Sequence, residues 1–316
     1  MENRTPEEEL EYRRYLRKRI RMRKRRRKVM IARAVVAFLS IVIVFFIFYG
    51  IGKMTDPVGG SDSSTVSQKK KPESTPFVVD IPDGYEKIYT KLYAMREDYP
   101  EVDDILMNLE QYPKDVLRLL IHNEETLSFV SNYPKHIDDE TVSGTITEEE
   151  TEEEIPLFQQ WDERWGYVRY SDNILAINGC GPTCISMVYT GLTKKTDMTP
   201  ADVADFSIEH NYYTKDSGTS WDMMLTGAQK LGLDAEKIAV NKEVIKEKLK
   251  AGQPVICSMK PGDFTQTGHF IVIRGLTDKG KMLINDPNSI ARSEKEWKFS
   301  TVLQQIKAAW TYTYTG

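Results

Sequence analysis

Cysteine and histidine are scarce in this sequence. Its 316 residues include 3 cysteines and 4 histidines. So few cysteines exclude a disulfide-rich scaffold, and their odd number leaves at least one thiol unpaired. No Cys-x-x-Cys or His-x-x-x-His pair occurs, although such spacings are typical of zinc sites. The sequence therefore predicts no metal site, and it indicates no other cofactor.

An excess of positive charge is confined to the start of the chain. The first 33 residues carry 14 Lys or Arg and 5 Glu, whereas the other 283 carry 29 basic and 42 acidic side chains. Because a body this acidic repels phosphate groups, we do not expect nucleic acid as a partner. The dense basic run from Arg13 to Lys28 is typical of a topology signal beside a membrane, and it suits anionic lipid headgroups.

Charged residues are absent from Ala34 to Ile51. As a helix these 18 residues would span about 27 Å, close to the hydrocarbon thickness of a bilayer. We predict a transmembrane helix over residues 30–52 after a tail of residues 1–29, which the basic residues keep in the cytoplasm. The rest of the chain is then expected outside the cell. A cleaved signal peptide is the alternative, but its apolar core is normally only ~7–15 residues long.

A linker and a small helical unit are predicted to follow. Residues 53–76 are rich in glycine, serine and lysine, which is typical of a flexible spacer. Residues 77–136 contain apolar residues at helical spacing, a proline suited to a first helical turn and a good N-cap: Val102, Ile105, Leu106, Leu109, Pro113 and Asn123. This helical unit is interpreted either as a spacer or cap for the next domain, or as a surface that binds substrate or a partner.

An acidic segment separates this unit from the C-terminal part. Residues 138–154 contain nine carboxylates and no basic residue. Like charges repel one another and no apolar pattern is present, so we predict a solvated linker over residues 137–154. The remaining residues, 155–316, are predicted to form one domain.

This domain has the element order of an α+β fold. Predicted helices over 199–210, 220–231 and 241–251 come first. Predicted strands over 254–259, 269–274, 281–285 and 309–314 come later. Helices followed by antiparallel strands favour an α+β architecture over an alternating α/β one.

A tight glycine turn surrounds the first cysteine. The sequence Asn178-Gly179-Cys180-Gly181-Pro182 leads into an apolar run typical of a buried helix, and proline suits its first turn. We therefore expect Cys180 just before this helix, where free N–H groups and the helix dipole favour the thiolate form of a cysteine. Cys184 and Cys257 lie in apolar runs and are predicted to be core residues.

A thiol nucleophile needs a base, and His269 is the best candidate. It begins an apolar run typical of a strand, and Asp286 ends the next such run. A turn over residues 277–280 would pair the two strands and bring His269 close to Asp286, whose carboxylate could fix the imidazole tautomer. His122 and His136 are interpreted as surface residues, and His210 as a poorer base.

Five short motifs between Ile155 and Tyr314 resemble the C39-like family of papain-fold cysteine peptidases. They are Gln160-x-Asp162-x-x-Trp165, Gly179-Cys180-Gly181-Pro182, Gly252-x-Pro254-Val255-Ile256, Gly268-His269-Phe270 and Asn285-Asp286-Pro287. The resemblance implies a papain-like catalytic domain with Cys180 as nucleophile, His269 as base and Asp286 as orienting carboxylate. It also implies that the Gln160 amide helps to bind the oxyanion, with the adjacent Gln159 as the alternative.

The function that this resemblance implies is cleavage of peptide bonds through an acyl-enzyme thioester. An amidase or transpeptidase with the same triad and an inactive peptide-binding relative are the alternatives. Some relatives are fused to ABC transporters and cut leader peptides inside the cell, but this chain has no Gly-x-x-x-x-Gly-Lys-Ser/Thr loop. We therefore expect a peptide or protein substrate on the outer side of the membrane.

Overall fold

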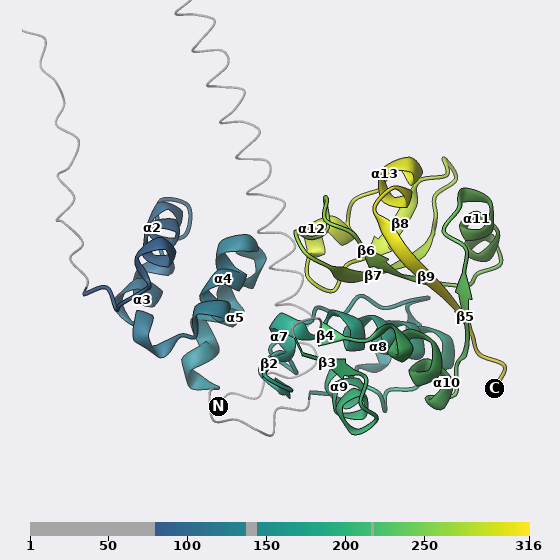
Figure 1. The fold of residues 1–316 in the computed structure, drawn as a ribbon, viewed down its shortest axis with the longest axis horizontal. Helices are drawn as coiled ribbons and strands as arrows, with labels where there is room; N and C mark the ends of the chain where they lie inside the picture. The colour runs from purple at the N-terminus through teal and green to yellow at the C-terminus, as the bar shows by residue number, and fades with distance from the viewer. Residues whose placement is uncertain (1–79, 137–143, 216–217) are drawn as a thin grey trace, which may run out of the picture. The chain divides into compact units, whose positions relative to one another are not determined.

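The computed structural model describes residues 80–136, 144–215 and 218–316 (Figure 1). The predicted tail 1–29, transmembrane helix 30–52 and linker 53–76 all lie outside these residues. Within the described ranges, no helix has the length and apolar character needed to cross a bilayer. Residues Val78–Gly316 group into one compact unit.

The first described segment is helical, as its apolar spacing predicted. Its helices are α2 (Glu86–Met95), α3 (Val102–Met107), α4 (Lys114–His122) and α5 (Leu127–Asn132), with short 3-10 turns η1 (Leu109–Gln111), η2 (Glu124–Thr126) and η3 (Tyr133–Lys135). The residues whose spacing predicted one helix face are all buried: Val102, Ile105, Leu106 and Leu109. Asn123 is an N-cap as expected, since its side chain accepts the N–H of Glu125. Helix α2 was not predicted.

The acidic segment differs from the solvated linker that its composition suggested. Residues Glu148–Glu152 form helix α6, which begins with a capping box between Thr147 and Glu150. Glu150 also forms an ion pair with Arg164 at 3.0 Å. A Thr-x-x-Glu pattern is the sequence signature of such a helix start, and here the count of carboxylates obscured it.

The centre of the C-terminal part is a five-stranded antiparallel sheet (Figure 1). Across the sheet the strands are β5 (Asp234–Ile238), β9 (Ile306–Thr313), β6 (Val255–Met259), β7 (His269–Leu276) and β8 (Met282–Asn285). Four of these strands lie where the sequence predicted them. Strand β5 was missed because it lies at an edge of the sheet and is rich in charged residues.

The described residues of the C-terminal part also contain seven further helices. They are α7 (Leu175–Asn178), α8 (Cys180–Thr193), α9 (Pro200–Glu209), α10 (Ala228–Lys230), α11 (Lys242–Lys250), α12 (Ile290–Ser293) and α13 (Phe299–Leu303). Two short hairpins, β1 (Arg169–Tyr170) with β2 (Asn173–Ile174) and β3 (Tyr213–Thr214) with β4 (Gly218–Thr219), complete this part. The helix predicted over 220–231 is a π-helical stretch η4 (Met223–Gly227) that continues into α10.

The two faces of the sheet belong to two separate hydrophobic cores. Ile256 and Val272 pack in one core with residues of α8 and α9. Cys257 and Ile271, their neighbours along the strands, pack in the other core with residues of α11. This alternation is the period of two that a pleated strand imposes. The sheet is therefore buried on both sides, and its β7–β8 edge carries His269 and the start of the Asp286 turn.

Candidate active site

Cys180 is the first residue of helix α8, and Gly179 is its N-cap. The sequence placed this cysteine just before the helix and Pro182 at the first position, so the observed start is earlier than predicted. The N–H groups of a first helical turn have no acceptor within the helix, and they carry the positive end of its dipole. The thiol of Cys180 is free and half-buried at this end.

The glycines beside Cys180 allow two close approaches. A Cβ atom on Gly179 would lie 2.4 Å from the carbonyl oxygen of Leu175 in α7. A Cβ atom on Gly181 would lie 2.5 Å from Oγ1 of Thr219 in β4, whose hydroxyl hydrogen-bonds to that of Tyr170 at 2.9 Å. The glycines of this motif are therefore needed because α7 and β4 pack directly against the start of α8.

His269 and Asp286 lie together at the edge of the sheet. His269 begins β7, and Asp286 immediately follows β8, which pairs with β7 through Val272 and Asn285. Nε2 of His269 lies 2.8 Å from Oδ1 of Asp286. His269 is 8% exposed and Asp286 is fully buried. The hairpin expected from the sequence thus brings these two residues into contact.

Asp286 has further partners that the sequence did not indicate. Nε of Arg292 donates a hydrogen bond to Oδ2 of Asp286 at 2.5 Å, and the N–H of Asn288 donates to Oδ1 at 2.8 Å. The backbone N–H of Asp286 donates to the hydroxyl of Ser293 at 2.8 Å. A basic residue six positions after an acidic one is too common a pattern to reveal such a pair, which depends on the turn into α12.

These contacts hold both members of the His269–Asp286 pair in their charged forms. Burial lowers the pKa of His269, but the charge and hydrogen bond of Asp286, together with the contact of Cys180, outweigh it and raise this pKa to about 10. Burial raises the pKa of Asp286, and His269 and Arg292 more than offset this, so the net pKa is lowered. Because Nε2 of His269 faces Asp286, its Nδ1 is the nitrogen left for Cys180.

The two glutamines lie on different sides of this site. Nε2 of Gln160 donates to the carbonyl of Ala176 at 2.8 Å and more weakly to that of Ile177 at 3.3 Å, both in α7, which leads into Cys180. Nε2 of Gln159 is 3.4 Å from the carbonyl oxygen of Asp286. Gln160 is therefore the glutamine on the cysteine side, and Gln159 is the one on the carboxylate side.

Residues 152–316, more than half of the chain, match the Peptidase_C39 like family. The chain belongs to this family. No curated protein matches the sequence. Residues 152–316 are accordingly a C39-like domain of the cysteine-peptidase type.

The other two cysteines lie in the cores of the C39-like domain. Cys184 and Cys257 are fully buried. Burial raises the pKa of the Cys184 thiol well above its usual value, with a further contribution from the nearby Cys180, and burial alone raises that of Cys257. Both thiols are therefore protonated and shielded, which leaves Cys180 as the accessible thiol.

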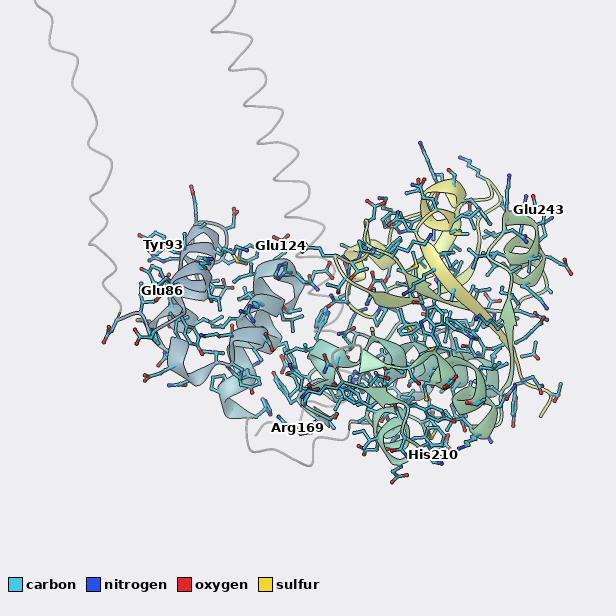
Figure 2. The ribbon with its side chains drawn as sticks, in the orientation of Figure 1. Glu86, Tyr93, Glu124, Arg169, His210 and Glu243 are labelled. Atoms are coloured by element: carbon cyan, nitrogen blue, oxygen red, sulfur yellow. The ribbon has the colours of Figure 1, made fainter. Side chains whose placement is uncertain are left out.

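The remaining histidines make other contacts. His122 and His210 each place Nδ1 against a backbone carbonyl four residues earlier, at 2.7 and 3.0 Å. His136 stacks on Tyr167 with ring centroids 4.4 Å apart. Figure 2 shows His210 at the outer end of α9, away from the sheet. Among the described residues, no group of three or more His, Cys, Asp or Glu is arranged to hold a metal ion.

Proposed function

We propose that this protein is a cysteine peptidase anchored in the cell membrane with its catalytic domain outside the cell, in which Cys180, His269 and Asp286 form the catalytic triad and Gln160 supplies an oxyanion donor. One observation carries the proposal. The imidazole of His269 is fixed by Asp286 at 2.8 Å on one side and interacts with the Cys180 thiol on the other. A thiol next to an imidazolium at a helix start is the arrangement that activates a cysteine nucleophile.

The first half of the proposed reaction forms a thioester. The Cys180 thiolate attacks the carbonyl carbon of the scissile amide, and a C–S bond forms as the carbonyl oxygen becomes an oxyanion. The N–H of Cys180 stabilises this charge, together with the Gln160 amide hydrogen once it leaves its weak 3.3 Å contact with the carbonyl of Ile177. The proton on Nδ1 of His269 passes to the amide nitrogen, the C–N bond breaks, and the amine leaves.

The second half releases the acid. His269, now neutral, accepts a proton from a water molecule as that water attacks the thioester carbonyl carbon. The C–S bond then breaks, the carboxylic acid departs, and Cys180 returns to the thiolate beside protonated His269. Asp286 keeps its charge throughout, because its role is to hold the imidazole and to stabilise its cationic form.

Membrane attachment rests on the sequence pattern of residues 30–52. An uncharged stretch preceded by basic residues favours one span with the C39-like domain outside. Extraction of membranes with alkaline carbonate tests the attachment, and protease treatment of intact cells tests the side. We expect the full chain to stay in the membrane pellet and its C39-like domain to be digested from outside. A chain that is released by carbonate, or protected in intact cells, would contradict the proposal.

The activity can be tested without knowing the substrate. We expect the full-length protein to cleave members of a mixed peptide library, with one ¹⁸O atom from labelled water entering each new carboxylate. Cys180→Ala should abolish the cleavage, and Cys184→Ala should retain it. Added hydroxylamine should intercept the thioester as a hydroxamate. Cleavage that persists in Cys180→Ala, or products without hydroxamate, would exclude the proposed mechanism.

A further inference from the structure

The helical unit contacts the segment that follows Asp286 through one partly buried side chain, Glu125. Its Oε1 accepts the hydroxyl of Ser289 at 2.8 Å and the N–H of Ala291 at 3.1 Å, and its Oε2 accepts the N–H of Ile290 at 2.6 Å. These donors form the start of α12, and they lie about 165 positions further along the sequence. Glu125 therefore caps a helix that belongs to the C39-like domain.

Asn123, the N-cap of the η2 turn, supports the same contact. Its Oδ1 accepts the N–H of Glu125 at 3.1 Å, which fixes the turn that presents Glu125. Its Nδ2 donates to the carbonyl of Asn288 at 2.5 Å. Two residues of the helical unit thus bind two successive parts of the segment 286–293.

This segment is the one that holds Asp286. Arg292 and Asn288 each donate a hydrogen bond to the Asp286 carboxylate, and Ser293 accepts the Asp286 backbone N–H. The hydroxyl of Ser289, which donates to Glu125, also accepts the N–H of Arg292 at 3.1 Å. Glu125 is therefore bound to the same short turn that holds the Asp286 carboxylate.

A helix as short as α12 cannot set its own geometry. It has four residues, so few internal hydrogen bonds form, and helices of this length are unstable without outside contacts. The N–H groups of its first turn need an acceptor, and Glu125 provides one for two of them. Burial raises the pKa of Glu125, so keeping a carboxylate here has a cost in stability, which the capping hydrogen bonds reduce.

We propose that Glu125 is a positioning residue for Asp286. It fixes the turn at α12, so that Arg292 and Asn288 stay on the Asp286 carboxylate and the carboxylate stays on His269. The helical unit is then part of the catalytic apparatus and is more than a spacer between the membrane and the C39-like domain. This inference rests on the proposed triad.

The test uses the full-length chain and three variants. Glu125→Ala removes the helix cap, whereas Glu125→Gln keeps the shape of the side chain and one acceptor oxygen. Glu124→Ala is the matched control, because Glu124 is the exposed neighbour of Glu125 (Figure 2). The rate of iodoacetamide labelling at Cys180 is measured by mass spectrometry from pH 5.5 to 9.5. A loss of mere stability would not change the shape of this pH profile, whereas a displaced Asp286 would.

We expect Glu125→Ala to label roughly tenfold more slowly than wild type at pH 6, because a displaced Asp286 lowers the pKa of His269 and a neutral imidazole no longer stabilises the Cys180 thiolate. At pH 9.5 the rates should converge, because thiolate then forms without an imidazolium. Glu125→Gln should regain most of the rate at pH 6, and Glu124→Ala should match wild type. A Glu125→Ala profile equal to that of wild type would overturn the inference.

Two measurements keep these outcomes separate. Labelling of the buried Cys184 would reveal that a variant is unfolded. If Glu125→Ala is unfolded, Asn123→Ala takes its place under the same criteria, because it removes the amide that supports the same turn. Wild type and His269→Ala are measured in parallel. If their profiles are the same, the proposed triad fails and the positioning role fails with it. If they differ but the helical-unit variants match wild type, only the positioning role fails.

Discussion

Nε2 of His269 lies 2.8 Å from Oδ1 of Asp286, and both side chains are almost completely shielded from solvent. This contact decides which ring nitrogen faces the cysteine. It also decides the charge of the imidazole, because the buried carboxylate outweighs the effect of burial on the pKa of His269. The charge of this pair, and the glycines beside Cys180, have consequences that can be measured.

Asp286→Asn should lower the pKa of the His269 imidazole. With the carboxylate gone, burial is opposed only by the smaller effect of the Cys180 contact, so the pKa of His269 should fall well below about 10. Proton NMR titration of the His269 ring measures this shift directly, and peptide cleavage should fall roughly 10²–10⁴-fold. Asp278→Asn, in the exposed turn between β7 and β8, is the control and should change neither. A His269 pKa that stays near 10 in Asp286→Asn would disprove the assigned cause.

The same pair predicts how stability depends on pH when the thiol is removed. In Cys180→Ala, Asp286 still raises the pKa of His269 in the folded state, so the contribution of His269 to stability is complete below about pH 6.5 and is lost as the pH rises through the folded-state pKa. The lowered pKa of Asp286 gives a contribution that is present above about pH 4 and is lost as the pH falls.

Urea denaturation of Cys180→Ala checks this linkage. The free energy of unfolding should fall by roughly 1–2 kcal/mol between pH 6.5 and 8, because the unfolded chain releases the imidazole proton and the folded chain keeps it. Adding His269→Ala should remove this fall, whereas adding His210→Ala should preserve it. A stability that is level over this range in Cys180→Ala would contradict a cationic His269.

Gly181→Ala should disturb the site through packing. The new Cβ would lie 2.5 Å from Oγ1 and 2.6 Å from Cβ of Thr219, so β4 must move and the Thr219–Tyr170 hydrogen bond is strained. We expect a loss of roughly 1–3 kcal/mol in the free energy of unfolding, more than alanine gains in helix propensity.

Gly275→Ala is the matched control for this substitution. No atom lies within 4 Å of the position that a Cβ on Gly275 would take, so its effect should stay within about 0.5 kcal/mol. Urea denaturation and Cys180 labelling are measured on both variants. If Gly181→Ala and Gly275→Ala change the free energy of unfolding equally, the close packing of β4 against α8 is not the reason that glycine is needed at position 181.

Local patterns in the sequence were enough to predict much of this fold. The apolar spacing through Val102 and Leu109 predicted buried helical positions, and the two apolar runs around the turn at 277–280 predicted the pairing of β7 with β8. Both patterns are periodic, and the residues that form each pattern lie close together in the sequence. The start of α8 at Cys180 was predicted to within a few residues for the same reason.

The contacts that the sequence did not reveal are those between distant polar residues. Arg292 and Glu125 carry no pattern that distinguishes them from other charged residues, and Glu125 lies about 165 positions before the N–H groups that it caps. Strand β5 was not predicted for a related reason. An edge strand is exposed, and its charged residues hide the alternation of apolar and polar positions. Such features depend on how the elements pack, and local periodicity does not encode that.

The most direct test of the central claim is the pH dependence of alkylation at the three cysteines of the full-length chain. With an imidazolium held beside it, Cys180 should react with iodoacetamide at pH 6 nearly as fast as at pH 8, while Cys184 and Cys257 stay unlabelled. In His269→Ala, Cys180 should react rapidly only as the pH approaches about 8.5, the usual range of a free thiol. Wild-type labelling that rises with pH as it does in His269→Ala, or that is shared equally among the three cysteines, would contradict the account.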